Sequence, residues 1–303
     1  MPVLRLILIV LMIPLSTVLH ILPLLLLTLI KALSPLESLR RACNGALTGI
    51  AESWIGVNNW MWNHLTSTRL VVEGFDEAAL ECGGHYLVLA NHQSWVDILT
   101  LQKAFNRRIP LLRFFLKRQL FWVPLLGLAW WALDFPFMGR YTPKQIARNP
   151  ELAGRDIEAT RKACEKFRQI PISIMNFVEG TRFTPTKHDA QHSPYRHLLK
   201  PKSGGVAFVL DAMGPGLHAI LDITIAYPGG PPSLGDLLGG RVEEIRLRVH
   251  RRPLPAHLLG GDYQNDREFR VRFQKWMNEL WQQKDADLAN LLGGDTKESA
   301  KPA

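Results

Sequence analysis

Two short segments of this chain combine residue types that can do chemistry. The first is NHQSWVD at residues 91–97, which follows an apolar run at 85–90 that is typical of a buried strand. A neutral imidazole there can take a proton from an attacking alcohol, an effect worth roughly 10²–10⁴-fold in rate. A carboxylate on the other ring nitrogen fixes the imidazole tautomer and stabilises the imidazolium. We therefore predict that His92 is a general base and that Asp97 orients it.

The spacing of this pair requires a turn between its members. Each helical residue rotates by about 100°, so residues five apart point about 140° away from each other on a continuous helix. His92 and Asp97 can meet only where a strand ends and a helix begins between them. The same spacing recurs at His257 and Asp262, where prolines and glycines stand in place of a strand. We expect that second pair to have no catalytic role.

The second segment is FVEGTR at residues 177–182, at the end of another run that is typical of a buried strand. Gly180 permits a tight turn that exposes backbone amides. Arg182 can bind a phosphate through two parallel hydrogen bonds. We expect Glu179 to hold Arg182 or a substrate hydroxyl, although the segment taken alone also fits a surface turn with an ion pair.

Alternating strands and helices must position these segments. The patterns predict strands at 69–75, 85–90, 172–178, 218–227 and 242–249, and helices at 96–105, 153–168, 203–212 and 266–284. Shorter strands are expected at 111–116 and 134–138. The Trp-rich run at 121–133 fits either a buried helix or a segment at a membrane interface. This order indicates an α/β fold with a mostly parallel or mixed sheet flanked by helices.

The first thirty-odd residues predict attachment to a membrane. Residues 6–30 are mostly apolar, with His20 as the only ionisable group, and a run of this length can cross a hydrocarbon core of about 30 Å. Pro14 and Pro23 leave a kinked, re-entrant helical pair open as the alternative. Basic residues flank the run and favour a cytoplasmic location for the rest of the chain. They are Arg5, Lys31, Arg40 and Arg41.

Composition sets the outer limits. The chain has 303 residues, of which 47% are hydrophobic, and its net charge is +9. We expect a membrane anchor at 1–40, a catalytic domain at 41–290 and a polar tail at 291–303. The positive charge favours anionic partners without choosing among nucleic acid, lipid and phosphorylated substrates. Three widely spaced cysteines indicate neither a zinc site nor a disulfide framework.

NHQSWVD followed in this order by FVEGTR resembles the lysophosphatidic acid acyltransferase family, the 1-acylglycerol-3-phosphate O-acyltransferases. The resemblance covers roughly residues 65–230 and the N-terminal segment. It implies a glycerophosphate acyltransferase-like fold, with His92 and Asp97 as the catalytic pair. It also implies four acceptor-binding residues, Glu179, Gly180, Thr181 and Arg182. Arg140 matches the last residue of the family's second motif, and we expect Arg140 and Lys202 to help bind phosphate.

The resemblance implies transfer of a fatty acyl group from acyl-CoA or acyl carrier protein to the sn-2 hydroxyl of lysophosphatidic acid, giving phosphatidic acid. The partners are then a lysophospholipid, an acyl donor and the bilayer, with no nucleic acid, metal or redox cofactor. The location implied is the cell membrane, as for a bacterial inner membrane, with the catalytic domain facing the cytoplasm. Strand 220–227 lacks the proline usual in the family's fourth motif, which leaves lysophosphatidylinositol and lysocardiolipin as alternative acceptors. A non-catalytic, membrane-anchored polyanion binder is the remaining rival.

Overall fold

The structure, a computed structural model, describes residues 2–139, 141, 143–149, 151, 154–167 and 170–293. Its centre is a six-stranded sheet in the order β1-β8-β7-β2-β6-β3. The strands of this sheet are β1 (Arg69–Glu73), β2 (His85–Ala90), β3 (Leu112–Phe114), β6 (Ile172–Phe177), β7 (Ala219–Ala226) and β8 (Glu244–Arg252). A separate two-stranded ribbon pairs β4 (Leu116–Lys117) with β5 (Phe137–Met138).

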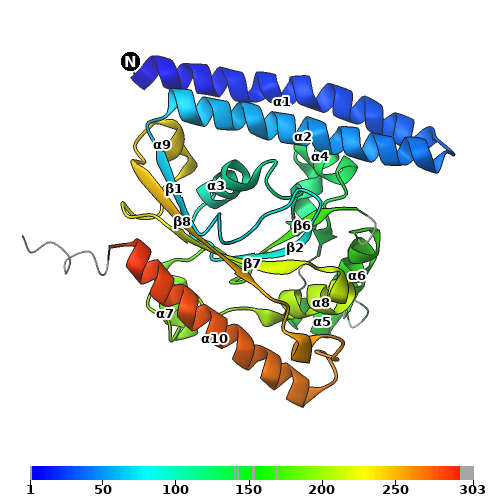
Figure 1. Ribbon diagram of the computed structural model, residues 1–303, viewed down its shortest axis with the longest axis vertical. Coiled ribbons are helices and arrows are strands. Elements are labelled where there is room, and N and C mark those ends of the chain that lie inside the picture. Colours follow the sequence, from blue (N-terminus) through cyan, green and yellow to red (C-terminus); the bar gives the residue numbers. More distant parts are fainter. Residues whose placement is uncertain are drawn as a thin grey trace, which may run out of the picture.

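Helices cover both faces of the sheet (Figure 1). The longer helices are α1 (Pro2–Leu33), α2 (Glu37–Leu65), α3 (Val96–Phe105), α6 (Arg155–Phe167), α8 (Ser203–Met213) and α10 (Arg267–Leu291). The shorter helices are η1 (Arg118–Trp122), α4 (Leu126–Ala132), α5 (Pro143–Arg148), α7 (Pro185–Gln191), η3 (Gly214–Gly216), α9 (Leu234–Leu238) and η4 (Ala256–Leu258). The predicted order of strands and helices is confirmed, and the Trp-rich run at 121–133 forms the end of η1 and all of α4.

Parallel pairing places the two chemical segments at one edge of the sheet. Strands β7, β2, β6 and β3 run parallel to one another, whereas β8 runs antiparallel to β7. Strand β2 lies beside β6, with Ala90 opposite Phe177. The segments that follow these two strands therefore leave the sheet next to each other, as parallel topology requires.

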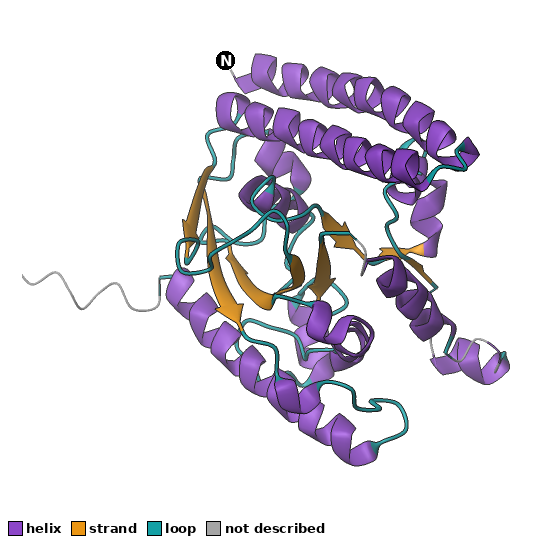
Figure 2. Ribbon diagram, turned by 45° about the vertical axis from the view of Figure 1, so that its right-hand side comes forward, coloured by secondary structure: helices purple, strands orange, loops and turns teal. Residues whose placement is uncertain are grey.

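The central strands are buried on both faces, which explains their nearly continuous apolar sequences. In β2, Val88 and Ala90 face the layer that contains α1 to α4, while Leu87 and Leu89 face α6, α8 and α10. Figure 2 shows the sheet between these two helical layers. The apolar side of α10 includes the fully buried Phe273 and Trp281.

Helix α2 was not predicted, and it packs along α1 as the second arm of a helical hairpin (Figure 1). Its buried residues Cys43, Leu47, Ala51 and Ile55 are four positions apart and form one stripe. The intervening polar residues hide that stripe from a search for apolar runs. The boundary expected at residue 40 falls inside α2.

Polar contacts join the two arms of the hairpin. The Trp54 indole N–H donates to Thr17 Oγ1 at 3.1 Å, and His20 Nε2 lies 3.2 Å from Ser53 Oγ. By length and composition, the helical stretch Arg5–Leu33 is able to cross a membrane. Its outer side is a row of exposed leucines, so this hairpin presents an apolar surface away from the sheet.

Candidate active site

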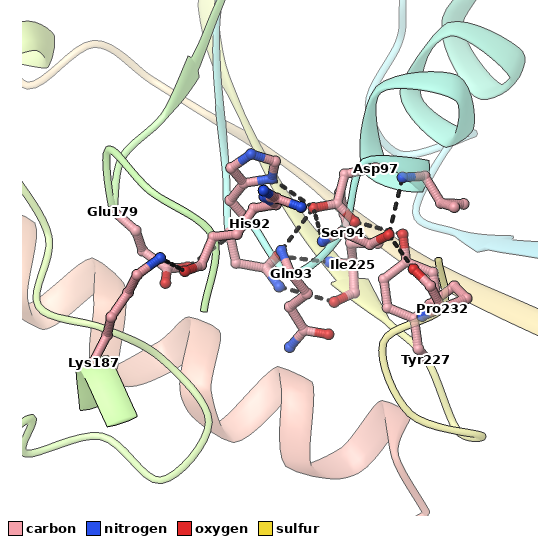
Figure 3. A network of polar contacts seen from close by, with 12 residues as sticks. His92, Gln93, Ser94, Asp97, Glu179, Lys187, Ile225, Tyr227 and Pro232 are labelled. Carbon is pink, nitrogen blue, oxygen red and sulfur yellow. Dashed lines mark hydrogen bonds and ion pairs between the residues drawn. The ribbon is translucent and has the colours of Figure 1, made fainter. Parts of the chain in front are cut away.

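The turn between β2 and α3 brings His92 and Asp97 together. His92 Nδ1 lies 2.8 Å from Asp97 Oδ2, and the Asp97 side chain is fully buried (Figure 3). Because a carboxylate only accepts, this contact assigns the proton to Nδ1 and leaves the lone pair on Nε2. The pair predicted from spacing is thus confirmed as a geometric unit. The turn required between its members is the strand-to-helix junction.

Asp97 is held by four donors. Its Oδ2 also accepts from the backbone N–H of Gln93 at 2.7 Å and of Ser94 at 2.9 Å, and its Oδ1 accepts from the Tyr227 hydroxyl. Burial and the neighbouring Asp97 carboxylate raise the pKa of Tyr227 well above its ordinary value, so this hydroxyl remains a donor. Four donors fix the carboxylate against the imidazole.

Five amides of this turn are already occupied. Besides the two that bind Asp97, the N–H of His92 donates to Glu179 and that of Val96 donates to Ser94 Oγ. The N–H of Asp97 donates to the Ser94 carbonyl. An oxyanion in this site therefore has to be stabilised by donors outside these five amides.

The imidazole of His92 stacks on Phe177, the last residue of β6. The two ring centroids are 4.0 Å apart and the ring planes differ by 14°. Stacking and the bond to Asp97 together fix the ring plane and the direction of Nε2. His92 also lines a cavity of about 590 Å³, so the fixed ring faces a space that can hold a ligand.

Glu179 has a different position from the one predicted. It is fully buried, and its two carboxyl oxygens accept from the backbone N–H of His92 at 3.0 Å and of Leu199 at 3.2 Å. Burial raises the pKa of Glu179 to about 8, against the opposing effect of those two donors. The carboxyl thus joins two loops beneath the site, where it contacts neither Arg182 nor open space.

Gly180 and Lys202 lie against each other at the cavity wall. Gly180 has φ +69°, a conformation that favours glycine. A Cβ atom at this position would lie 3.0 Å from Lys202 Cδ and 3.2 Å from Lys202 Nζ. Both residues line the same cavity as His92. The glycine therefore gives the Lys202 side chain its path toward the site.

Arg182 is held on the other side of this turn by an exposed aromatic ring. Its Cζ atom lies 4.7 Å from the centroid of the Trp95 ring, and the Trp95 side chain is 55% exposed. Lys187 Nζ donates to Thr181 Oγ1 at 2.8 Å and to the Arg182 carbonyl at 2.9 Å. The N–H of Phe183 donates to the His92 carbonyl at 2.7 Å, which joins the two segments directly.

The cavity beside His92 extends into the helical layer above the sheet. Its apolar wall includes Leu24 of α1, Trp54 and Ile55 of α2, Ile98 of α3 and Ala129 of α4. These side chains line the same space as His92, Gly180 and Lys202. Such a space suits a hydrocarbon chain, with its reactive end at the imidazole.

Two further sequence predictions concern Arg140 and the His257–Asp262 pair, which we expected to have no catalytic role. Arg140 lies outside the residues that the structure describes. His257 lies in η4, and the Asp262 carboxylate instead accepts from the backbone N–H groups of Gln264 and Asn265. This pair thus lacks the contact found at His92. Among the described residues, no group of three or more His, Cys, Asp and Glu side chains could hold a metal ion.

Some contributors were missed from the sequence. The Asn91 side chain donates to the Ile225 carbonyl at 2.9 Å and accepts from the Ile225 N–H at 2.8 Å, so it extends the β2–β7 pairing by one residue. Tyr227 reaches Asp97 from the end of β7. Asn91 is part of the NHQSWVD motif, so the sequence pointed to it. Nothing in the sequence near Tyr227 indicates its contact with Asp97, 130 positions earlier.

The fold and the site together define an α/β protein with a His-Asp pair at the carboxyl ends of parallel strands, open to an apolar cavity. A family model described as Acyltransferase matches residues 69–227. The chain belongs to this acyltransferase family, and the resemblance noted from the two motifs is confirmed.

Similar proteins include several lipid acyltransferases. Human 1-acyl-sn-glycerol-3-phosphate acyltransferase gamma is 26% identical over 246 residues, which are 75% of this chain and 60% of that protein. Mouse lysocardiolipin acyltransferase 1 is 24% identical over 262 residues, 81% of this chain and 64% of the relative. Saccharomyces cerevisiae 2-acyl-1-lysophosphatidylinositol acyltransferase is 25% identical over 236 residues, 66% of this chain and 59% of the relative. The chain thus spans about 60% of the length of these relatives.

A solved structure shares the fold. The crystal structure of the 1-acyl-sn-glycerophosphate (LPA) acyltransferase, PlsC, from Thermotoga maritima gives a TM-score of 0.54 at 17% sequence identity. The match covers 95% of this chain and 98% of that one. The predicted α/β fold with a mostly parallel sheet is therefore confirmed.

Proposed function

We propose that this chain transfers a fatty acyl group from acyl-CoA or acyl carrier protein to the sn-2 hydroxyl of lysophosphatidic acid, giving phosphatidic acid. One observation carries the proposal: an imidazole fixed by a buried carboxylate lies at the wall of an apolar cavity of about 590 Å³. The acyl chain occupies that cavity, which brings its thioester carbon to His92. Membership in the acyltransferase family supports this assignment.

The reaction is a direct transfer between two bound substrates. His92 Nε2 takes the proton of the acceptor hydroxyl as its oxygen attacks the thioester carbonyl. Asp97 stabilises the imidazolium that forms, and the tetrahedral oxyanion then collapses with release of the thiolate. The imidazolium returns its proton to that thiolate. The acyl group never bonds to the protein, and the chemistry calls for no metal or redox cofactor.

The acceptor phosphate is assigned to the cations around His92. Its phosphate is only a few bonds from the attacked hydroxyl, so its site must lie close to the imidazole. Lys202 lines the same cavity as His92, and Arg182 lies beside the loop that carries His92. These two cations suit a phosphate monoester.

The apolar surface of α1 supports a place at the membrane. We assign the chain to the cell membrane, with the sheet on the cytoplasmic side, as the basic residues that flank residues 6–30 indicate. The exposed leucines of α1 face away from the sheet and provide a surface for lipid contact. A lysophospholipid already in the bilayer then has a short path to the cavity.

The similar proteins also include a second acceptor class. Relatives named for lysocardiolipin and lysophosphatidylinositol match this chain at 24% and 25% identity, close to the value for the lysophosphatidate relative. The experiment is transfer from radiolabelled acyl-CoA to lysophosphatidate, lysophosphatidylinositol and lysocardiolipin by purified protein. We expect lysophosphatidate to be the best acceptor and His92→Ala to abolish transfer to it.

Two outcomes would change the assignment. Near-normal turnover by His92→Ala would overturn the mechanism, and preference for another lysolipid would change the acceptor while leaving the mechanism intact. Salt-sensitive RNA binding without any acyl transfer would favour the non-catalytic polyanion binder instead.

A further inference from the structure

A crevice of about 590 Å³ lies next to the cavity beside His92, which we call the acyl cavity. It is formed by the start of η1, the β5 strand with the residues after it, and the first half of α6. Its chemically distinctive lining residues are Arg118, Arg155, Lys162, Glu158, Phe137 and Tyr141. None of the residues that we assign to the chemical step lines it.

The crevice and the acyl cavity share a wall. Lys117 lines the cavity whereas the next residue, Arg118, lines the crevice. In α6, Thr160 lines the cavity and Ala159 lines the crevice. The Thr160 hydroxyl also lies 3.7 Å from the sulfur of Met138, which closes α6 against β5. A flexible ligand can therefore place one end in each space by passing over this thin wall.

The crevice is positively charged. Three cations, Arg118, Arg155 and Lys162, line it together with one carboxylate, Glu158. That carboxylate is bound closely by Arg161, which reaches its two oxygens at 2.9 and 2.7 Å, whereas Lys162 lies 3.5 Å from it. Arg155 lies 3.9 Å from Glu151, whereas Arg118 has no carboxylate partner among the described residues. The surplus of cations suits a ligand with several phosphate charges.

Aromatic rings stand beside these cations. Phe137 and Tyr141 both line the crevice. The Tyr141 ring lies against Gly139 so closely that a Cβ atom there would come within 2.4 Å of it. Flat apolar surfaces next to cations match a purine base joined to phosphates, because the base stacks while the phosphates are bound by charge.

We propose that this crevice binds the phosphorylated nucleotide end of acyl-CoA, with the acyl chain in the neighbouring cavity. The inference rests on the proposed function. The acceptor phosphate lies a few bonds from its hydroxyl and must be near His92, whereas the pantetheine arm separates the phosphates of CoA from the thioester. A phosphate site that adjoins the acyl cavity without including His92 is therefore suited to the donor.

The test compares donors in the full-length protein in detergent. The variant is Arg118→Ala with Lys162→Ala, and the matched control is Lys275→Ala, which removes an exposed cation from α10. We expect the double variant to raise the KM for acyl-CoA about tenfold, as for lost hydrogen bonds between charged groups. Its kcat, its KM for lysophosphatidate and its turnover of an acyl-pantetheine donor stay the same. The control behaves like the wild type.

Direct binding separates this inference from the proposed function. By calorimetry, we expect CoA to bind the wild type and the control, and to bind the double variant about tenfold more weakly. This result would support the crevice even if no lysolipid were acylated. Unchanged binding and KM for CoA would overturn the inference. A rise in KM for lysophosphatidate alone, or for acyl carrier protein alone, would also overturn it. Equal unfolding temperatures would exclude a folding defect.

Discussion

At the scale of single residues, the site depends on the four hydrogen bonds that the Asp97 carboxylate accepts. Asp97 Oδ2 accepts from the His92 ring and from two backbone amides, and Oδ1 accepts from Tyr227. An amide at this position has only one acceptor oxygen. Its NH₂ group would have to face either Tyr227 or the three donors at Oδ2. In the second orientation the imidazole loses its fixed tautomer, and in both the imidazolium loses the charge that stabilises it.

Asp97→Asn is therefore expected to lower kcat by ~10²–10⁴-fold, in the range that general-base catalysis supplies. Tyr227→Phe removes one donor and leaves the His92 contact in place, so it should cost much less. Steady-state transfer rates with saturating acceptor and donor make the comparison. Equal losses in the two variants would show that Asp97 acts only through packing.

Trp95 is exposed and yet lies within the chemical segment, which points to a positioning role. The centroid of its ring lies 4.7 Å from Arg182 Cζ. Cation–π contacts are worth about 0.5–2 kcal/mol, so Trp95→Ala should raise the KM for lysophosphatidate about two- to thirtyfold. The value of kcat should change little.

The phosphate-free acceptor monoacylglycerol separates positioning from a general defect. On the proposed function, Trp95 acts through the arginine that binds the phosphate, so Trp95→Ala should not alter any acylation of monoacylglycerol. Trp95→Phe keeps an aromatic face and should restore most of the affinity for lysophosphatidate. Equal losses with both acceptors would contradict this role.

At the scale of elements, Glu179 links the end of β2 to the loop before α8. Its carboxyl is buried between the N–H groups of His92 and Leu199, and Asp97 adds a like charge that also raises its pKa. Burial raises that pKa to about 8 from an ordinary value of 4.5. The folded protein therefore binds a proton here that the unfolded chain releases at lower pH.

This linkage sets the direction of a pH effect. The proton stabilises the folded state fully below pH 4.5, and the contribution is lost as the pH rises toward 8. The slope is at most about 1.4 kcal/mol per pH unit. Glu179→Gln, which does not titrate, should show a smaller fall in unfolding temperature between pH 5 and pH 9. A steeper fall in the variant would contradict the assignment.

Predictability from the sequence also varied by element. The His92 and Arg182 segments were placed correctly because each follows a strand with an unmistakable apolar run. Helix α2 was missed because its buried stripe is only one residue wide per turn. The contacts of Glu179 were predicted wrongly because a carboxylate near an arginine suggests an ion pair. No local pattern reveals that two distant backbone amides donate hydrogen bonds to this carboxyl.

At the scale of the whole molecule, one helical layer faces the sheet with one side and carries exposed apolar residues on the other. Besides the leucines of α1, this layer exposes Trp122 at 80% and Trp131 at 54%. Helix α4 contacts α1, and Lys31 lies 3.2 Å from Asp134 just after α4. The two tryptophans and the α1 surface thus belong to one connected body.

Trp122→Ala combined with Trp131→Ala is expected to weaken binding to phospholipid vesicles about tenfold, which corresponds to ~1.4 kcal/mol. Vesicle co-sedimentation measures the change. Val271→Ala is the control, because Val271 is 57% exposed on α10 in the other helical layer. Equal binding by all variants would place the lipid contact elsewhere.

On the proposed function, the outer surface of the α1–α2 hairpin contacts lipid and its inner surface lines the acyl cavity. The same hairpin then affects both the membrane that the protein prefers and the fatty acids that it selects, so the two properties change together. A substitution that adapts the hairpin to a thicker or more fluid bilayer also reshapes the space beside Trp54. Lineages that move to a new temperature would thereby change the fatty acids that they install.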